Sequence, residues 1–318
     1  MSVEFDFSTT LGNAWFPAPI FTASGCASSG RELAQFFPLG RIGAVVTKSV
    51  MLKARAGRPA PRMAETPSGM LNSIGLQGPG IEVFLENDLP WLIENGARVI
   101  VSIAGETIEE YAILARRLRS VTGISAIEVN ISCPNVEDRG TVFACDPNAS
   151  SAVIDGVRRT LGGAVPIIAK LSPDVTDIVG IARSVIDAGA DGLALINTLL
   201  GMVINTETMR PHLGGKTGGL SGPAIRPVAV RAIYQVHQTF PKIPILGMGG
   251  VRTGKDAFEM ILAGASGVSV GTATFGNPTA LIAVQKELHT LLINKGFASV
   301  GEAIGYAHRQ DERLDDDR

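Results

Sequence analysis

The sequence predicts an α/β fold, the (β/α)8 TIM barrel. Eight short apolar runs recur along the 318 residues, and amphipathic helical patterns separate most of them. The runs are almost continuously apolar, as in strands that are buried on both faces. A doubly wound open sheet is the alternative, but closure into a barrel buries every strand, and single barrels with insertions reach this length.

The N-terminal residues are the first predicted element. Residues 1–19 contain Phe5, Phe7, Leu11 and Trp15, and we expect them to form a hairpin that closes the bottom of the barrel. We expect residues 1–306 to form a single domain. The charged residues 307–318 contain little that a core would bury, so they are predicted to be a disordered tail.

Strands and helices follow in alternation. The predicted strands are residues 20–23, 44–48, 99–103, 127–131, 167–171, 193–197, 245–247 and 268–270. Helical patterns cover residues 107–121, 176–188, 223–240, 253–262 and 279–294. At the start of the first of these helices, Thr107 and Glu110 have the spacing of a capping box.

Three connections are longer than usual, at residues 50–78, 134–148 and 199–222. Each follows a predicted strand, so each is expected at the C-terminal face of the barrel, where enzymes of this architecture have their active sites. Long loops at this face commonly act as lids or as walls of a substrate pocket.

Composition and charge indicate small-molecule chemistry. The chain is 45% hydrophobic and has a net charge of -2, which gives no sign of a broad surface for nucleic acid or anionic membranes. Its three cysteines, Cys26, Cys133 and Cys145, have no metal-site spacing, so we expect free thiols and no metal. No apolar run approaches the ~20 residues of a membrane helix, and no signal pattern is present. We therefore expect a cytoplasmic protein.

Polar side chains collect where the predicted strands end. Any one of them is explained by an ordinary strand end, but their convergence on one mouth of the barrel indicates a site for a polar ligand. They are Ser24, Lys48, Ser102, Asn130, Lys170, Asn197 and Thr198.

The stretch AIEVNISCPN, residues 126–135, carries the strongest catalytic signal. A strand containing Ile127, Val129 and Ile131 runs into Cys133, and Pro134 ends its pairing. Two asparagines and a thiol are unfavourable to bury without partners, so they are expected to face a ligand. An inert core cysteine at a strand-end turn is the alternative.

Two glycine-containing loops predict a phosphate site. GMGGV at 247–251 follows the seventh predicted strand, and VGTAT at 270–274 follows the eighth. Backbone N–H groups of these two loops frequently bind phosphate in such barrels. Tight turns that need glycine are the alternative for either loop alone.

A phosphate-anchored cofactor, Lys170 and the absence of a nicotinamide-type GxGxxG motif together indicate FMN, because a lysine offsets negative charge on a reduced flavin ring. Simple sugar phosphates, as in an isomerase or aldolase barrel, remain an alternative. Cys133 favours the flavin, since a thiol with an ordinary pKa near ~8.5 is suited to removing a carbon-bound proton while hydride leaves to an oxidant.

These residues resemble the dihydroorotate dehydrogenases, flavin barrels that oxidise (S)-dihydroorotate to orotate in pyrimidine biosynthesis. The resemblance covers nearly the whole chain. Its motifs are TASG at 22–25, TKS at 47–49, GMLNSIGLQGPG at 69–80, NISCPN at 130–135, KLSP at 170–173, INT at 196–198, GGLSGPAIRPVAVR at 218–231 and the two phosphate loops.

The resemblance implies a role for each motif residue. Cys133 is the catalytic base that takes the C5 proton while FMN accepts hydride from C6. The substrate residues it implies are Lys48, Asn72, Gly75, Leu76, Asn130, Asn135, Asn197 and Thr198. The FMN residues are Ala23, Ser24, Lys48, Ser49, Ser102, Asn130, Lys170, Ile196, Gly222, Gly249, Gly250, Gly271 and Thr272, and Ser102 replaces an expected asparagine.

The subclass determines the electron acceptor. A cysteine base argues against the quinone-linked class, and the stretch from LLGM at 199–202 to GGLSGPAIRPVAVR at 218–231 resembles the NAD-linked, two-subunit class 1B. The resemblance implies a partner subunit carrying FAD and a [2Fe–2S] cluster, with a homodimer inside a heterotetramer. The fumarate-linked class and the dihydropyrimidine dehydrogenase branch are the alternatives. The latter has histidine after its Cys-Pro pair, where this chain has Asn135.

Overall fold

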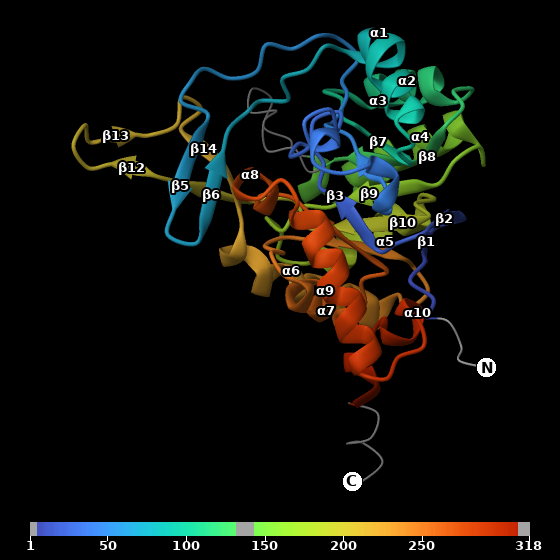
Figure 1. The fold of residues 1–318 in the computed structure, drawn as a ribbon. Helices are drawn as coiled ribbons and strands as arrows, with labels where there is room; N and C mark the ends of the chain where they lie inside the picture. Colours follow the sequence, from blue (N-terminus) through green and yellow to red (C-terminus); the bar gives the residue numbers. More distant parts are fainter. Residues whose placement is uncertain (1–4, 132–142, 311–318) are drawn as a thin grey trace.

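A computed structural model of the protein describes residues 5–131 and 143–310. Its largest sheet has eight parallel strands in the order β3-β16-β15-β10-β9-β8-β7-β4. Several of these strands, among them β3 and β7 to β10, are labelled in Figure 1. An isolated parallel bridge from Phe21 to Ala44 joins the two ends of this order, which closes the barrel. The strands are β3 Ile20–Thr22, β4 Val45–Val46, β7 Val99–Ile103, β8 Ile124–Asn130, β9 Ile167–Lys170, β10 Gly192–Leu195, β15 Ile245–Met248 and β16 Gly267–Val270.

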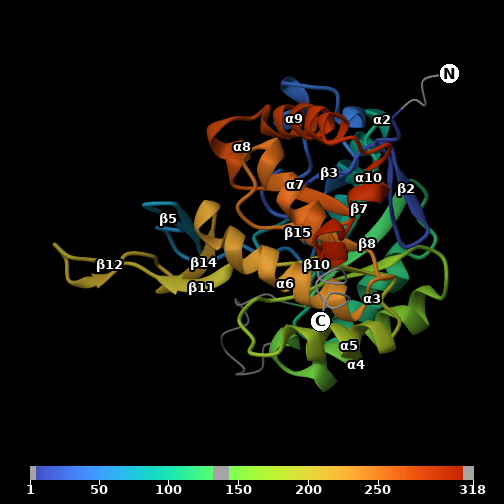
Figure 2. The ribbon, with the colours of Figure 1, turned by 90° about the horizontal axis from the view of Figure 1, so that it is seen from below.

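All eight predicted strands are therefore confirmed, and helices lie between them around the outside of the barrel (Figure 2). The helices are α1 Ile81–Val83, α2 Leu89–Glu94, α3 Ile108–Leu118, α4 Pro147–Leu161, α5 Ile178–Asp187, α6 Arg226–Thr239, α7 Gly254–Ala263, α8 Ala273–Gly276, α9 Ala280–Asn294 and α10 Val300–Ala303. A π-helical turn, Phe84–Asp88, joins α1 to α2. None of the helices in the described residues is long and apolar enough to span a membrane.

The helix caps correct one sequence prediction. Thr107 does cap α3 by accepting from the N–H of Glu110, but the Glu110 carboxylate accepts from Glu106 N instead of Thr107 N. The reciprocal capping box lies at α7, between Thr253 and Asp256. Spacing alone was misleading because an acidic residue in the first turn has several N–H groups within reach.

The N-terminal hairpin fills the lower end of the barrel. It consists of β1 Thr9–Leu11 and β2 Ala14–Phe16, paired antiparallel. Leu11 and Phe16 are 0% exposed and join the barrel's inner apolar cluster, where Phe16 packs edge-on against Phe21. The prediction that Trp15 helps to close the bottom of the barrel was wrong. It is 54% exposed, since neighbouring residues of a strand point to opposite faces.

The segments predicted as two long connections contain a second sheet that the sequence did not predict. Four antiparallel strands lie in the order β11-β14-β6-β5 and project from the barrel together with the hairpin β12–β13 (Figure 1). These strands are β5 Met63–Thr66, β6 Gly69–Asn72, β11 Leu199–Met202, β12 Ile204–Asn205, β13 Arg210–Pro211 and β14 Thr217–Ser221. Residues 134–142 of the third long connection, 134–148, lie outside the described part of the chain. It continues as a 3-10 turn, Phe143–Cys145, and then as α4.

The C-terminal turn Tyr306–Gln310 packs on α6 and α7. His308 stacks on Tyr234 with ring centroids 3.9 Å apart, and its Nε2 lies 3.1 Å from Ala263 O. Ordered structure therefore continues to residue 310 within the predicted tail, and residues 311–318 lie outside the described part of the chain.

This packing gives a pH-dependent contribution to stability. Burial lowers the pKa of His237 on α6, and His308, whose ring centroid is 5.0 Å away, lowers it further. The unfolded chain then binds more protons than the folded chain below the ordinary histidine pKa of ~6.5. We expect the free energy of unfolding to fall as the pH drops from about 6.5 to the lowered pKa, and His237→Asn to flatten this decline in urea titrations. His212→Asn is the control, and equal slopes in the two variants would contradict the assignment.

Candidate active site

Two adjoining cavities open at the C-terminal ends of the barrel strands. The larger has a volume of about 640 Å³ and the smaller about 330 Å³. Their sizes are typical of small-molecule sites. They border each other, because they share the lining residues Ser24, Cys26, Lys170, Asn197, Thr198, Ser221 and Thr272.

The larger cavity brings both predicted phosphate loops together. Gly249 and Gly250 follow β15, and Gly271 and Thr272 follow β16. Gly250 has φ +78°, and a Cβ there would lie 2.7 Å from Gly222 O, so the loop needs glycine to pack this closely. Nine of the predicted FMN residues line this cavity, namely Ala23, Ser24, Lys170, Ile196, Gly222, Gly249, Gly250, Gly271 and Thr272.

Asp256 stabilises the backbone that follows the predicted phosphate loop at residues 247–251. Its carboxylate accepts from the backbone N–H groups of Arg252 and Thr253, both at 2.9 Å, and pairs with Arg226 at 2.5 Å. Because Asp256 is only 9% exposed, these contacts compensate for its loss of water. The backbone of the loop is therefore fixed before any ligand is bound.

The smaller cavity is lined by every predicted substrate residue that the structure describes. These are Lys48, Asn72, Gly75, Leu76, Asn130, Asn197 and Thr198. They come from different strand ends and from the projecting sheet. Asn72 Nδ2 donates to Gly219 O at 3.3 Å, and Thr198 N donates to Asn197 Oδ1 at 2.8 Å.

A left-handed turn forms one wall of this cavity. Gly75 has φ +77° and Leu76 has φ +53°, a conformation that side chains with a Cβ rarely adopt. A Cβ on Gly75 would lie 2.8 Å from Arg58 N, so no larger residue fits here without moving the backbone. Strained non-glycine residues such as Leu76 concentrate at ligand sites, which is consistent with its predicted role.

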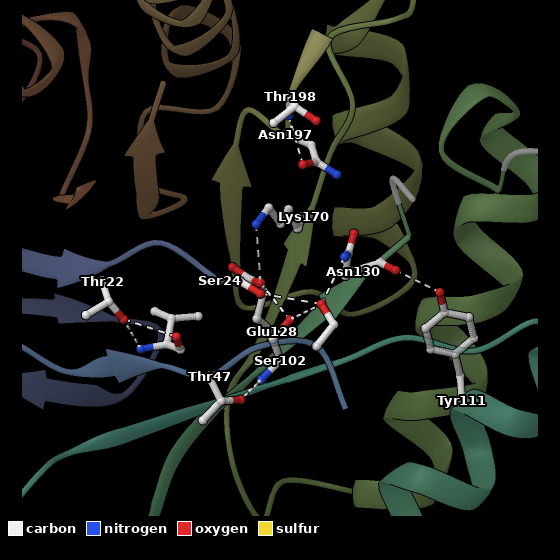
Figure 3. A network of polar contacts seen from close by, with 12 residues as sticks. Thr22, Ser24, Thr47, Ser102, Tyr111, Glu128, Asn130, Lys170, Asn197 and Thr198 are labelled. Carbon is white, nitrogen blue, oxygen red and sulfur yellow. Dashed lines mark hydrogen bonds and ion pairs between the residues drawn. The ribbon is translucent and has the colours of Figure 1, made fainter. Parts of the chain in front are cut away.

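Ser49 and Asn130 line the smaller cavity and lead into a buried polar network (Figure 3). Asn130 Nδ2 donates to Ser49 Oγ at 3.0 Å, and Ser49 Oγ lies 2.9 Å from Ser102 Oγ. Ser102 is 0% exposed and lines neither cavity. Ser102 therefore contacts other side chains of the site, and its contact with the flavin stays a prediction.

Glu128 is the residue of this network that sequence reasoning missed. It is 0% exposed, accepts from Ser102 Oγ at 2.8 Å and pairs with Lys170 Nζ at 3.6 Å. Strand alternation contains the signal that identifies it, because Glu128 lies two residues before Asn130 and so shares its face of β8.

The predicted base Cys133 and the predicted substrate residue Asn135 lie outside the described residues. The other two cysteines are described. Burial raises the pKa of Cys26, and Lys170 and Lys48 only partly oppose this shift. Burial and the neighbouring Asp174 raise the pKa of Cys145. Both thiols therefore keep their protons at neutral pH and are poor bases.

Comparison with known proteins gives a consistent result. A family model described as "Dihydroorotate dehydrogenase" matches residues 7–292. The chain is 52% identical over 291 residues to "Dihydroorotate dehydrogenase B (NAD(+)), catalytic subunit" of Desulforudis audaxviator, an alignment that covers 92% of this chain and 94% of the relative. Proteins of the same name from Geotalea uraniireducens and Desulforamulus reducens are 47% and 46% identical, over 94% and 96% of this chain and 97% and 100% of theirs. The chain belongs to the dihydroorotate dehydrogenase family.

Proposed function

We propose that this chain oxidises (S)-dihydroorotate to orotate, a step of pyrimidine biosynthesis, with FMN in the larger cavity and substrate in the smaller one. The observation that carries the proposal is the lining of the smaller cavity, which includes all seven described substrate residues of the family pattern. The family match and the names of the relatives point to the same reaction.

The residues of the larger cavity fit FMN. Two glycine loops and Thr272 at the ends of β15 and β16 offer N–H and hydroxyl donors of the kind that bind phosphate. Lys170, 5% exposed at its side chain, brings a positive charge to the junction with the smaller cavity, where the ring would lie. FMN, when bound, supplies the acceptor for the hydride that leaves C6 of the substrate.

The chain's own residues bind the substrate and move one proton. Asn72, Asn130 and Asn197 carry amides that can donate to carbonyl and carboxylate oxygens and accept from ring N–H groups. Lys48 adds a positive charge suited to the substrate carboxylate. Cys133, three residues after the end of β8 at Asn130, takes the C5 proton as its thiolate, and Asn135 completes the substrate contacts.

We also propose an NAD-linked assembly, in which a partner subunit with FAD and a [2Fe–2S] cluster receives the electrons and two copies of this chain form the centre of a heterotetramer. The relatives' name specifies NAD(+) and a catalytic subunit, which supports the NAD link and a separate electron-transfer subunit. Exposed apolar side chains occur at the smaller cavity, where Met63 and Phe275 line it, and on the projecting strands and their loop, where they are Leu200, Met202, Ile204 and Met209. Exposed apolar patches commonly mark protein interfaces.

Anaerobic mixing with dihydroorotate tests the reaction. We expect a yellow protein whose flavin absorbance bleaches on mixing, with one orotate formed for each flavin reduced. The readout is the visible absorbance together with orotate measured by chromatography. A colourless protein that takes up no FMN would favour a non-redox phosphosugar barrel, and flavin that dihydroorotate leaves oxidised would exclude this substrate.

A further inference from the structure

Glu128 is a carboxylate inside the barrel, next to both cavities. It lies on β8 between Ala126, which belongs to the inner apolar cluster, and Asn130, which lines the smaller cavity. Its neighbours Ile127 and Val129 belong to the outer cluster that packs against the helices. Burying an ionised carboxylate at 0% exposure is strongly unfavourable unless positive charge and hydrogen-bond donors compensate for the lost water.

One oxygen of Glu128 has both kinds of partner. Ser102 Oγ donates to Oε1 at 2.8 Å, and Lys170 Nζ lies 3.6 Å from the same atom (Figure 3). Oε2 has no hydrogen-bond partner among residues 5–131 and 143–310. Lys170 itself lines both cavities. Its ammonium therefore lies between a buried negative charge on one side and the ligand site on the other.

The carboxylate also determines the direction of the hydrogen bonds around it. An ionised carboxylate only accepts, so Ser102 must donate to Glu128 and accept from Ser49. Ser49 then accepts from Asn130 Nδ2 and from Ser24 Oγ, which lies 3.4 Å away. The orientation of the polar groups at the cavity wall thus follows from the charge on Glu128.

We propose that Glu128 is a positioning residue that fixes the Lys170 ammonium at the junction of the cavities and offsets part of its charge toward the bound ring. The inference rests on the proposed function, because it takes the ring to be FMN. Reduction adds negative charge to the flavin, which the lysine stabilises. Glu128, by opposing Lys170, keeps the bound flavin easier to reoxidise, as a subunit that passes its electrons to a partner requires.

Glu128→Gln is the informative change, because it removes the charge but retains the volume and an oxygen that accepts from Ser102. We expect the equilibrium constant for two-electron reduction of bound FMN to rise about tenfold, a midpoint shift of about 30 mV to more positive potential. The shift is measured by anaerobic spectroscopic titration against reference dyes. It does not depend on turnover with dihydroorotate.

Two further variants serve as controls. Glu128→Asp retains the charge, so its equilibrium constant is expected to stay within about threefold of the wild-type value. Glu82→Gln removes an ion-paired but exposed glutamate, the partner of Arg117 on the surface, and is expected to leave the potential unchanged. In a Lys170→Met background, Glu128→Gln is expected to lose most of its effect, since it acts through the lysine.

The outcomes separate the two proposals. A wild-type chain that binds no FMN overturns the proposed function. A wild-type chain that binds FMN and is bleached by dihydroorotate, with a Glu128→Gln variant of unchanged or more negative potential, overturns the Glu128 role alone. If Glu128→Gln does not fold, the double variant with Lys170→Met is expected to recover folding, because neither buried charge is then left alone. A double variant no better than the single one also overturns the Glu128 role.

Discussion

Cys133→Ala is expected to slow flavin reduction by dihydroorotate about 10²- to 10⁴-fold, the range that general-base catalysis contributes. FMN is expected to remain bound, because the cavity that fits it is lined by other residues. Stopped-flow absorbance under anaerobic conditions measures the rate, and bound flavin per chain is measured on the same sample. In the wild-type protein, the rate is expected to rise with pH through the thiol pKa, since only the thiolate accepts the proton.

Cys26→Ala is the matched control for this experiment. Cys26 lines both cavities, yet burial raises its pKa. It is therefore a cysteine at the same site that stays protonated and cannot act as a thiolate base. We expect Cys26→Ala and Cys145→Ala to reduce flavin within a few-fold of the wild-type rate. Near-normal reduction by the Cys133→Ala variant at every pH would remove Cys133 from the mechanism.

The second large effect concerns the electron acceptor. The purified chain is expected to reduce its own flavin with dihydroorotate but to pass essentially no electrons to NAD. Three cysteines cannot supply the four ligands of an iron–sulfur cluster, and no strand-linked GxGxxG offers a dinucleotide site. NADH formation at 340 nm, followed with and without the co-purified partner subunit, measures this difference.

The exposed apolar side chains of the projecting strands and their loop provide a structural control for the same experiment. Met202→Asp and Met209→Asp change exposed residues that line neither cavity. They are expected to leave flavin reduction unchanged and to weaken NAD reduction by the assembled enzyme. NAD reduction by the homogeneous chain alone would refute the two-subunit assignment, and fast turnover with fumarate would transfer the chain to the one-subunit class.

The barrel was predictable because its signal is local. Each strand is a short apolar run, such as Val99–Ile103, in which every residue is buried. The second sheet was not predictable in this way. Its strands β6 and β14 contain glycine and are only partly buried, and Asn72 pairs with Gly219 far along the chain, so no local periodicity marks them.

The site residues, likewise, were predictable only where the signal is local. Residues such as Lys48 and Asn197 were recognised because they end apolar strands, and both line the smaller cavity. Glu128 was missed because it lies inside a strand, where an acidic residue is normally taken as facing solvent. Only the closed barrel turns that position inward, toward Lys170 on the next strand.

The sheet β11-β14-β6-β5 joins two distant parts of the chain, and this affects the order in which the protein folds during synthesis. Asn72 takes its final position against β14, whose residues 217–221 are synthesised well over a hundred residues later. A nascent chain that has released only β3 to β9 already contains most of the apolar strands, but its substrate wall lacks the strand that supports it. Such late, long-range pairing is slow to form. Substrate recognition is thus acquired only after β14 has been synthesised, about two thirds of the way along the chain.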